Sequence, residues 1–232
     1  MGALEQRNCS NRRAQVISSR LTGVNRVLCL GAHSDDIEIG CGATVLQLQE
    51  QSPNLEFCWV VFCSNPLRAK EAQKSAAWFL RRVKHKTIII KSFRDGFLPY
   101  NGGEVKDCFE ELKRSYQPDL IFTHVRDDLH QDHRLLCELT WNTWRSHLVL
   151  EYEIPKYDAD LRSPNCFVPV RKALADAKVK ALMRYFGTQR NKHWFSEDLF
   201  YGLMRLRGVE AASPTPFAEG FHCRKLALGP LL

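Results

Sequence analysis

The first 150 residues of the chain alternate between short apolar runs and longer segments with helical periodicity. Runs with the length and apolar character of buried strands cover residues 26–31, 55–63, 87–90, 120–123 and 149–153. Between them, apolar residues recur every three or four positions, which predicts helices over residues 43–50, 67–83, 104–116 and 132–147. Because strand and helix alternate, we expect the strands to pair in parallel through right-handed crossovers. The pattern therefore predicts an α/β fold with a mostly parallel sheet sandwiched by helices.

The last third of the chain is less regular. Prolines punctuate residues 153–170, and helical patterns follow over residues 171–186 and 196–207. A final apolar run covers residues 221–228. We expect this part to extend the same domain and to wall its active site.

The predicted domain organisation follows from these patterns. Residues 26–232 are expected to form a single domain, with an α/β core at 26–150 and a C-terminal cap at 151–232. Residues 1–25 are polar, lack the apolar stretch of a secretory signal and are expected to form a lead-in. No apolar run approaches the 18 or so residues of a membrane span, so none is expected.

Charge and cysteine content narrow the class of protein. The net charge of +7 has no stacking motif or zinc finger beside it, so nucleic acid is not the expected partner, and an anionic small molecule suits the charge better. Nine cysteines occur without a C-x-x-C pair, and Cys29, Cys58 and Cys63 lie in strand-like runs. Free thiols there behave as small apolar side chains, which favours a reducing compartment and a cytoplasmic location. The oligomeric state stays open, with a homo-oligomer as one option.

Two histidine–aspartate clusters, about 100 residues apart, stand where strands are predicted to end. His33, Asp35 and Asp36 follow the first apolar run. The second cluster follows the fourth run and contains His130, Asp132 and His133. The junction between a strand and the next helix is where an α/β sheet carries its active site.

These residue types suit one divalent metal ion, with groups left over for proton transfer. A carboxylate and two imidazoles leave a position open for water, whose pKa the metal lowers toward 7. His33 and Asp36 are close enough in sequence to turn toward one point, and either His130 or His133 can supply the second imidazole. A remaining carboxylate would then act as general base.

A purely structural interpretation was weighed against the metal site. An acidic pair after a strand can cap a helix, and Asp132 can serve as the N-cap of the helix that follows it. Two such clusters at corresponding junctions of one chain favour the metal site.

The two clusters also resemble the motifs of a known family. The segment GAHSDDIEIGCGA, residues 31–43, resembles the A-H-P-D-D signature of LmbE-like zinc deacetylases, also called the PIG-L family. The segment THVRDDLHQDHR, residues 123–134, resembles the family's second motif, a histidine-x-aspartate-histidine after an acidic turn. Further similarities lie in LRAKEAQKSA, FRDG, KALMRYFGTQ and AEGFHCRKL, so the resemblance spans nearly everything after Arg26.

The resemblance implies a Rossmann-like fold and a role for each cluster residue. It implies that His33, Asp36 and His133 bind Zn²⁺ or another divalent metal, and so selects His133 over His130. Asp35 would be the general base. His130 would be a positively charged partner that stabilises the oxyanion and protonates the leaving amine. Asp132 would hold a neighbouring histidine in its working tautomer.

The implied activity is removal of an N-acetyl group from an amino sugar or amino-sugar conjugate. Arg68 and Asp95, from the Leu67–Ala76 and Phe93–Gly96 similarities, would contact this substrate. Ser34 replaces the usual proline and Ala43 the second glycine, changes that affect loop rigidity and leave the ligands in place.

Two other functions were weighed. A Rossmann-like nucleotide-binding protein would need G-x-G-x-x-G after the first strand, which this chain lacks. A catalytically silent metal-binding relative would have no need of Asp35 or His130. Bound zinc in protein purified without added metal, measured again in His133→Ala, separates the three. The nucleotide-binding protein predicts no metal in either sample, and the silent relative predicts metal without acetate release from any N-acetylated sugar.

Overall fold

The computed structural model describes residues 23–227 of the chain. Most of the predicted lead-in and the last residue of the final apolar run therefore lie outside the described residues. The elements, in chain order, are β1 (Arg26–Gly31), α1 (Asp36–Gln51), β2 (Glu56–Cys63), α2 (Pro66–Phe79), β3 (His85–Phe93), the 3₁₀ turn η1 (Leu98–Asn101), α3 (Gly102–Ser115), β4 (Leu120–His124), α4 (Gln131–Thr143), β5 (Leu148–Tyr152), β6 (Cys166–Val170), α5 (Lys172–Tyr185), α6 (Glu197–Glu210) and β7 (Phe217–His222).

One seven-stranded sheet has the order β3-β2-β1-β4-β5-β7-β6. The first five strands are parallel, and β7 runs antiparallel to both β5 and β6. The predicted α/β class with a mostly parallel sheet is confirmed. Each of the five predicted strands is present, with ends that differ from the expected ones by at most three residues.

Strands β6 and β7 were not predicted, because prolines interrupt this part of the sequence. Pro169 lies inside β6, which pairs only with β7 and forms an edge of the sheet. A proline lacks a backbone N–H, and an edge strand tolerates the loss because one side of it has no partner. Residues 151–227 thus extend the sheet as well as covering it.

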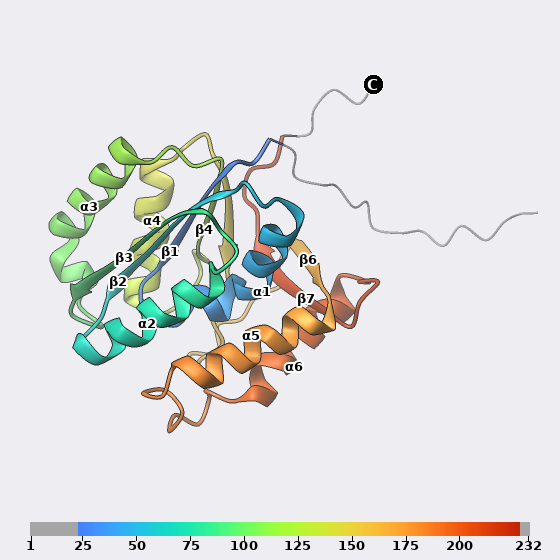
Figure 1. The fold of residues 1–232 in the computed structure, drawn as a ribbon. Coiled ribbons are helices and arrows are strands. Elements are labelled where there is room, and N and C mark those ends of the chain that lie inside the picture. The colour runs from blue at the N-terminus through green and yellow to red at the C-terminus, as the bar shows by residue number, and fades with distance from the viewer. Residues whose placement is uncertain (1–22, 228–232) are drawn as a thin grey trace, which may run out of the picture.

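Helices cover both faces of the sheet (Figure 1). Alternate residues of β1 and β2 point to opposite sides: Val27, Phe57 and Trp59 pack with α1, α2 and α5, whereas Leu28 and Val60 pack with α3 and α4. A strand buried on both faces reads as a continuous apolar run, as these do. The edge strand β3 is half exposed and correspondingly more polar.

Helix α1 begins seven residues before its predicted start because a kink divides it. Cys41 has non-helical dihedrals, φ −139° and ψ 16°, which interrupt the periodicity that the sequence pattern relies on. A buried ion pair, Lys178 with Glu219, binds the backbone polar groups on either side of the kink. Glu219 accepts hydrogen bonds from the amides of Ala43 and Thr44, and Lys178 donates to the carbonyl of Ile39.

Gly40 is required by close packing against β5. A Cβ atom at this position would overlap the ring of Tyr152, which is fully buried and donates a hydrogen bond to the carbonyl of Leu30. We expect Gly40→Ala to lower the free energy of unfolding by about 1–3 kcal/mol, the usual cost of overpacking a core. Gly202→Ala is the matched control, because Gly202 is exposed in α6 with open space around it. That change should raise stability by about 0.5–1 kcal/mol. Urea unfolding of both variants measures the difference, and equal effects would contradict it.

Among residues 23–227, no helix combines the length and the apolar composition that crossing a membrane requires.

Candidate metal centre

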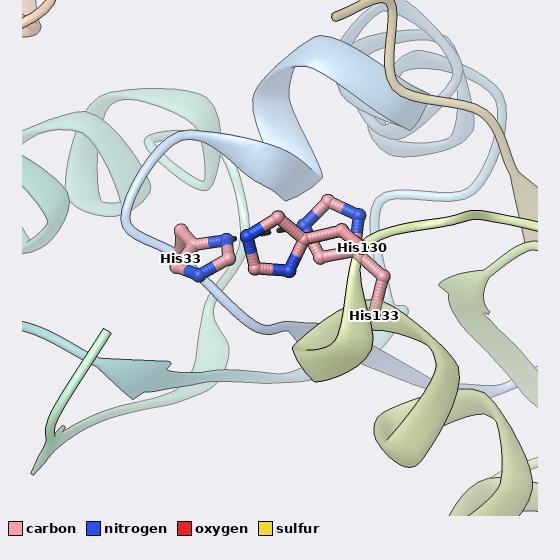
Figure 2. A group of neighbouring side chains, drawn as sticks. All are labelled: His33, His130 and His133. Atoms are coloured by element: carbon pink, nitrogen blue, oxygen red, sulfur yellow. Dashed lines mark hydrogen bonds between the residues drawn. The ribbon is translucent and has the colours of Figure 1, made fainter. Parts of the chain in front are cut away.

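The two histidine–aspartate clusters meet at the carboxyl edge of the sheet, where the order of connections reverses. From β1 the chain proceeds to β2 and β3 on one side, and it returns to β4 and β5 on the other. The ends of β1 and β4 are therefore adjacent, and the loops that leave them diverge. This is the position at which open α/β sheets bind ligands. Figure 2 shows His33, from the loop after β1, facing His130 and His133 at the start of α4.

Three side-chain atoms converge there. The Nδ1 atom of His33 lies 3.1 Å from Nε2 of His133 and 3.3 Å from Oδ2 of Asp36. The remaining pair, His133 Nε2 and Asp36 Oδ2, is 3.5 Å apart. Ligand atoms at about 2.0–2.1 Å from a tetrahedral zinc ion are separated by about 3.3 Å. The donor types and their spacing thus fit a zinc ion.

Carboxylates on the far side of both imidazoles leave these nitrogens available. Nε2 of His33 lies 3.2 Å from Asp132 and 3.1 Å from Asp95. Nδ1 of His133 lies 2.8 Å from Oδ2 of Asp128. A carboxylate neighbour favours a proton on the nitrogen beside it, so the other nitrogen keeps a lone pair for a metal.

The charges of His133 and Asp36 match this arrangement, and those of His33 do not. Burial opposes the charge of His33, but Asp36, Asp132 and Asp95 raise its pKa well above the usual value, which favours a protonated imidazole whose proton a metal would displace. Burial, together with His124, lowers the pKa of His133 to about 3, so this imidazole is neutral. Burial opposes ionisation of Asp36, but the imidazoles of His133, His33 and His124 hold its pKa well below the usual range. A neutral imidazole and an ionised carboxylate are the forms that bind zinc.

Asp132 is held firmly in its position. Its side chain is fully buried and accepts hydrogen bonds from the amides of Gly96, at 2.7 Å, and Leu98, at 3.0 Å. Gly96 has φ +81°, a conformation that favours glycine, and this explains the glycine in the FRDG segment. The loop after β3 is thereby tied to the carboxylate beside His33.

Asp35 does not belong to the trio of converging residues, His33, Asp36 and His133, and it pairs with Arg68 instead. A guanidinium nitrogen of Arg68 is 3.2 Å from Asp35, and another is 2.7 Å from Asp95. Burial raises the pKa of Asp35, and the neighbouring Asp36 raises it further, whereas Arg68 lowers it. Arg68 and Asp95, predicted to contact substrate, thus lie together at the centre, with Asp95 the more exposed of the two.

His130 lies beside the trio, with its ring 4.8 Å from that of His33 and 4.5 Å from that of His133. Its Nδ1 accepts a hydrogen bond from the backbone amide of Asp132, so His130 also caps α4. The purely structural interpretation of the sequence, which the metal site outweighs, gave that cap to Asp132. Burial and the charge of His33 lower the pKa of His130, which favours the neutral form over the positively charged one expected.

Sequence reasoning missed His124 and Asp128. His124, fully buried at the end of β4, has Nε2 3.2 Å from Asp36 Oδ2 and forms with Asp36 and His133 one of three groups able to hold a metal among the described residues. The other two groups combine His33 and His130 with His133, or with Asp95 and Asp132. The groups that contain His33 are the more accessible ones, since His33 is 7% exposed, whereas His124 is fully buried. A histidine at the strand end and an acid two residues before His130 were the available signals.

Comparisons with known proteins agree with this geometry. The model of the family PIG-L, GlcNAc-PI de-N-acetylase, matches residues 28–144, half of the chain. The solved N,N'-diacetylchitobiose deacetylase from Pyrococcus horikoshii is 22% identical, with a TM-score of 0.68 over 87% of this chain and 84% of that one. The A40926 pseudoaglycone deacetylase Dbv21 is 15% identical, with a TM-score of 0.64 over 88% and 99%.

A third structural neighbour has a different chemistry. GalB, the 4-carboxy-2-hydroxymuconate hydratase from Pseudomonas putida KT2440, is 16% identical, with a TM-score of 0.71 over 90% of this chain and 99% of that one. At such identities the likeness shows the fold alone, and one fold supports several activities. The family model is more specific, because it spans both histidine–aspartate motifs. The protein therefore belongs to the PIG-L family of LmbE-like de-N-acetylases.

Proposed function

We propose that the protein is a zinc-dependent hydrolase that removes an N-acetyl group from an amino sugar or an amino-sugar conjugate. The observation that carries the proposal is the convergence of His33 Nδ1, Asp36 Oδ2 and His133 Nε2 within 3.5 Å of one another. Zinc held by these residues would polarise the amide carbonyl and lower the pKa of a water molecule. Two imidazoles and a carboxylate also suit other divalent metals, such as Fe²⁺, and the family resemblance favours zinc among them.

The residues around the trio supply the proton transfers. Asp35 is proposed to take a proton from the water that attacks the amide carbon, and its raised pKa brings it closer to the range of an effective base. The neutral His130 has an N–H to donate to the oxygen on which negative charge develops. Protonated Asp35 can then return its proton to the nitrogen as the C–N bond breaks, which releases acetate and a free amine.

Asp132 and Asp128 are proposed to act through the ligands. Each lies against the nitrogen of His33 or His133 that faces away from the converging atoms. Arg68 is proposed to orient Asp35 and, with Asp95, to bind a hydroxyl or an anionic group of the substrate. The exposed Tyr100, on η1 five residues after Asp95 in the sequence, is a further candidate for contact with a sugar ring.

A screen of N-acetylated compounds tests the proposal. Free N-acetylglucosamine, nucleotide-linked and glycoside-linked N-acetylamino sugars are incubated with zinc-loaded protein, and free amine and acetate are measured together. Equal release of both products from at least one compound supports the proposal. Zinc binding without release from any of them would support the silent-relative alternative.

The acid limb of the pH profile should depend on Arg68. Asp35 can accept a proton only when ionised, so kcat/KM should fall as the pH drops through its raised pKa. Because Arg68 lowers the pKa of Asp35, Arg68→Ala should move this limb to higher pH, whereas Arg68→Lys should move it less. The profile is measured on the best substrate of the screen. A limb that stays in place in Arg68→Ala would exclude Asp35 as its source.

A further inference from the structure

Lys156, in the loop after β5, lies enclosed between two buried carboxylates. Its ammonium is 2.9 Å from Oδ1 of Asp128 and 2.5 Å from Oδ2 of Asp160. The side chains of these three residues are 9%, 1% and 3% exposed, respectively. One cation thus compensates two anions in a place that water hardly reaches.

The turn that carries Lys156 contacts the loop before α4 at both of its ends, through Lys156 at one end and Asp160 at the other. Asp160, four residues later, also accepts a hydrogen bond from the amide of Leu129, at 2.7 Å. Ala159 has φ +53°, a left-handed conformation that a residue other than glycine adopts only where its surroundings impose it. Residues 156–160 are therefore fixed against the loop that carries His130.

Asp128 connects this ion pair to the proposed metal ligand. One of its oxygens faces Lys156 and accepts the amide of His130, while the other lies 2.8 Å from Nδ1 of His133. The carboxylate is thereby fixed at both oxygens, and its orientation decides which nitrogen of His133 carries the proton. Without the ammonium, Asp128 and Asp160 would keep their hydrogen bonds but lie buried side by side without a cation between them, an unfavourable arrangement that rotation of Asp128 away from His133 would relieve.

We propose that Lys156 is a positioning residue of the metal centre: it holds Asp128 against Nδ1 of His133 and so keeps Nε2 directed at the metal. The inference rests on the proposed role of His133 as a ligand. It gives the segment after β5 a part in metal affinity as well as in walling the pocket. Loss of an outer partner of a metal-binding histidine typically weakens metal binding by about 10- to 100-fold.

Zinc affinity, measured by chelator competition on purified protein, tests the inference. Lys156→Met should weaken zinc binding by about 10- to 100-fold. Lys156→Arg, which keeps the charge, should restore most of the affinity. Lys172→Met is the matched control, because Lys172 forms an ion pair with Asp176 at the same four-residue spacing on an exposed helix surface. This control should bind zinc like the wild type.

Cobalt substitution gives a second readout. Reorientation of His133 in Lys156→Met should change the visible spectrum of bound Co²⁺. If Lys156 only links the two loops and does not orient His133, the spectrum should stay the same. Lys156→Gln, which retains an N–H donor to Asp128, serves if Lys156→Met does not fold, and it should show a smaller loss of the same kind.

The outcomes separate this inference from the proposed function. If the wild type binds zinc, His133→Ala does not, and the Lys156 variants keep wild-type affinity and spectrum, the role of Lys156 is overturned while the proposed function stands. If the wild type binds no zinc, the proposed function itself is overturned. Lower thermal stability with unchanged zinc affinity would assign Lys156 a structural role only and would also overturn the inference.

Discussion

Replacement of His133 by alanine should yield protein that no longer retains zinc. Nε2 of His133 lies within 3.5 Å of both other converging atoms, and the side chain is 3% exposed. Alanine removes the donor without adding another in its place. The loss should exceed the roughly 10- to 100-fold effect of removing an outer partner, because one of the protein ligands is itself lost.

The measurement is the zinc content of protein purified without added metal, by elemental analysis, for the wild type and the variant. His85→Ala is the control, since His85 is exposed at the amino end of β3, at the opposite edge of the sheet. We expect close to one zinc ion per chain in the wild type and in this control, and little in His133→Ala. Circular dichroism checks that the variant remains folded.

Other outcomes would redirect the functional assignment. A nucleotide-binding protein with acidic helix caps predicts no zinc in any of these samples. Zinc retained by His133→Ala would point to the group of Asp36 and His124 as part of an alternative ligand set. Loss of zinc only in a double variant of His124 and His133 would then place the ion deeper than proposed.

The sequence predicts the core of this fold because buried strands appear as short apolar runs, and the crossover helices between them appear as segments of helical periodicity. The run at β1 matches its strand residue for residue, and β2 and β4 differ from theirs by one residue. Such runs are apolar on both faces, since the sheet is covered on both sides. The start of α1 was wrong because the kink at Cys41 depends on Glu219 and Lys178, which lie far away in the sequence.

The sequence predicts only part of the set of residues that meet at the site. Local patterns place His33 after one strand and His133 after another. Their contact depends on β1 and β4 being neighbours, which follows from the strand order of the whole sheet. The partners of the imidazoles were harder to predict: Asp128 resembles any acid in a turn until its carboxylate is seen between His133 and Lys156.

Replacement of Asp35 by asparagine should abolish most of the catalysis while leaving zinc in place. The side chain of Asp35 is 4% exposed and pairs with Arg68, and none of its atoms is among the converging atoms of His33, Asp36 and His133. Asparagine has nearly the same shape and can still accept a hydrogen bond from Arg68, but it cannot take a proton from water. A positioned general base contributes about 10²- to 10⁴-fold, so kcat should fall by roughly that factor.

The zinc content distinguishes loss of the base from loss of the metal. Asp35→Asn should retain zinc like the wild type and show a KM within a few-fold of it, because the change acts on proton transfer and spares binding. Asp36→Asn, one residue along the chain, should instead lose zinc and activity together. Asp107→Asn, on the exposed surface of α3, controls for removal of a negative charge. If Asp35→Asn kept wild-type kcat, the proton would have to leave through another group, and the proposed role of Asp35 would be overturned.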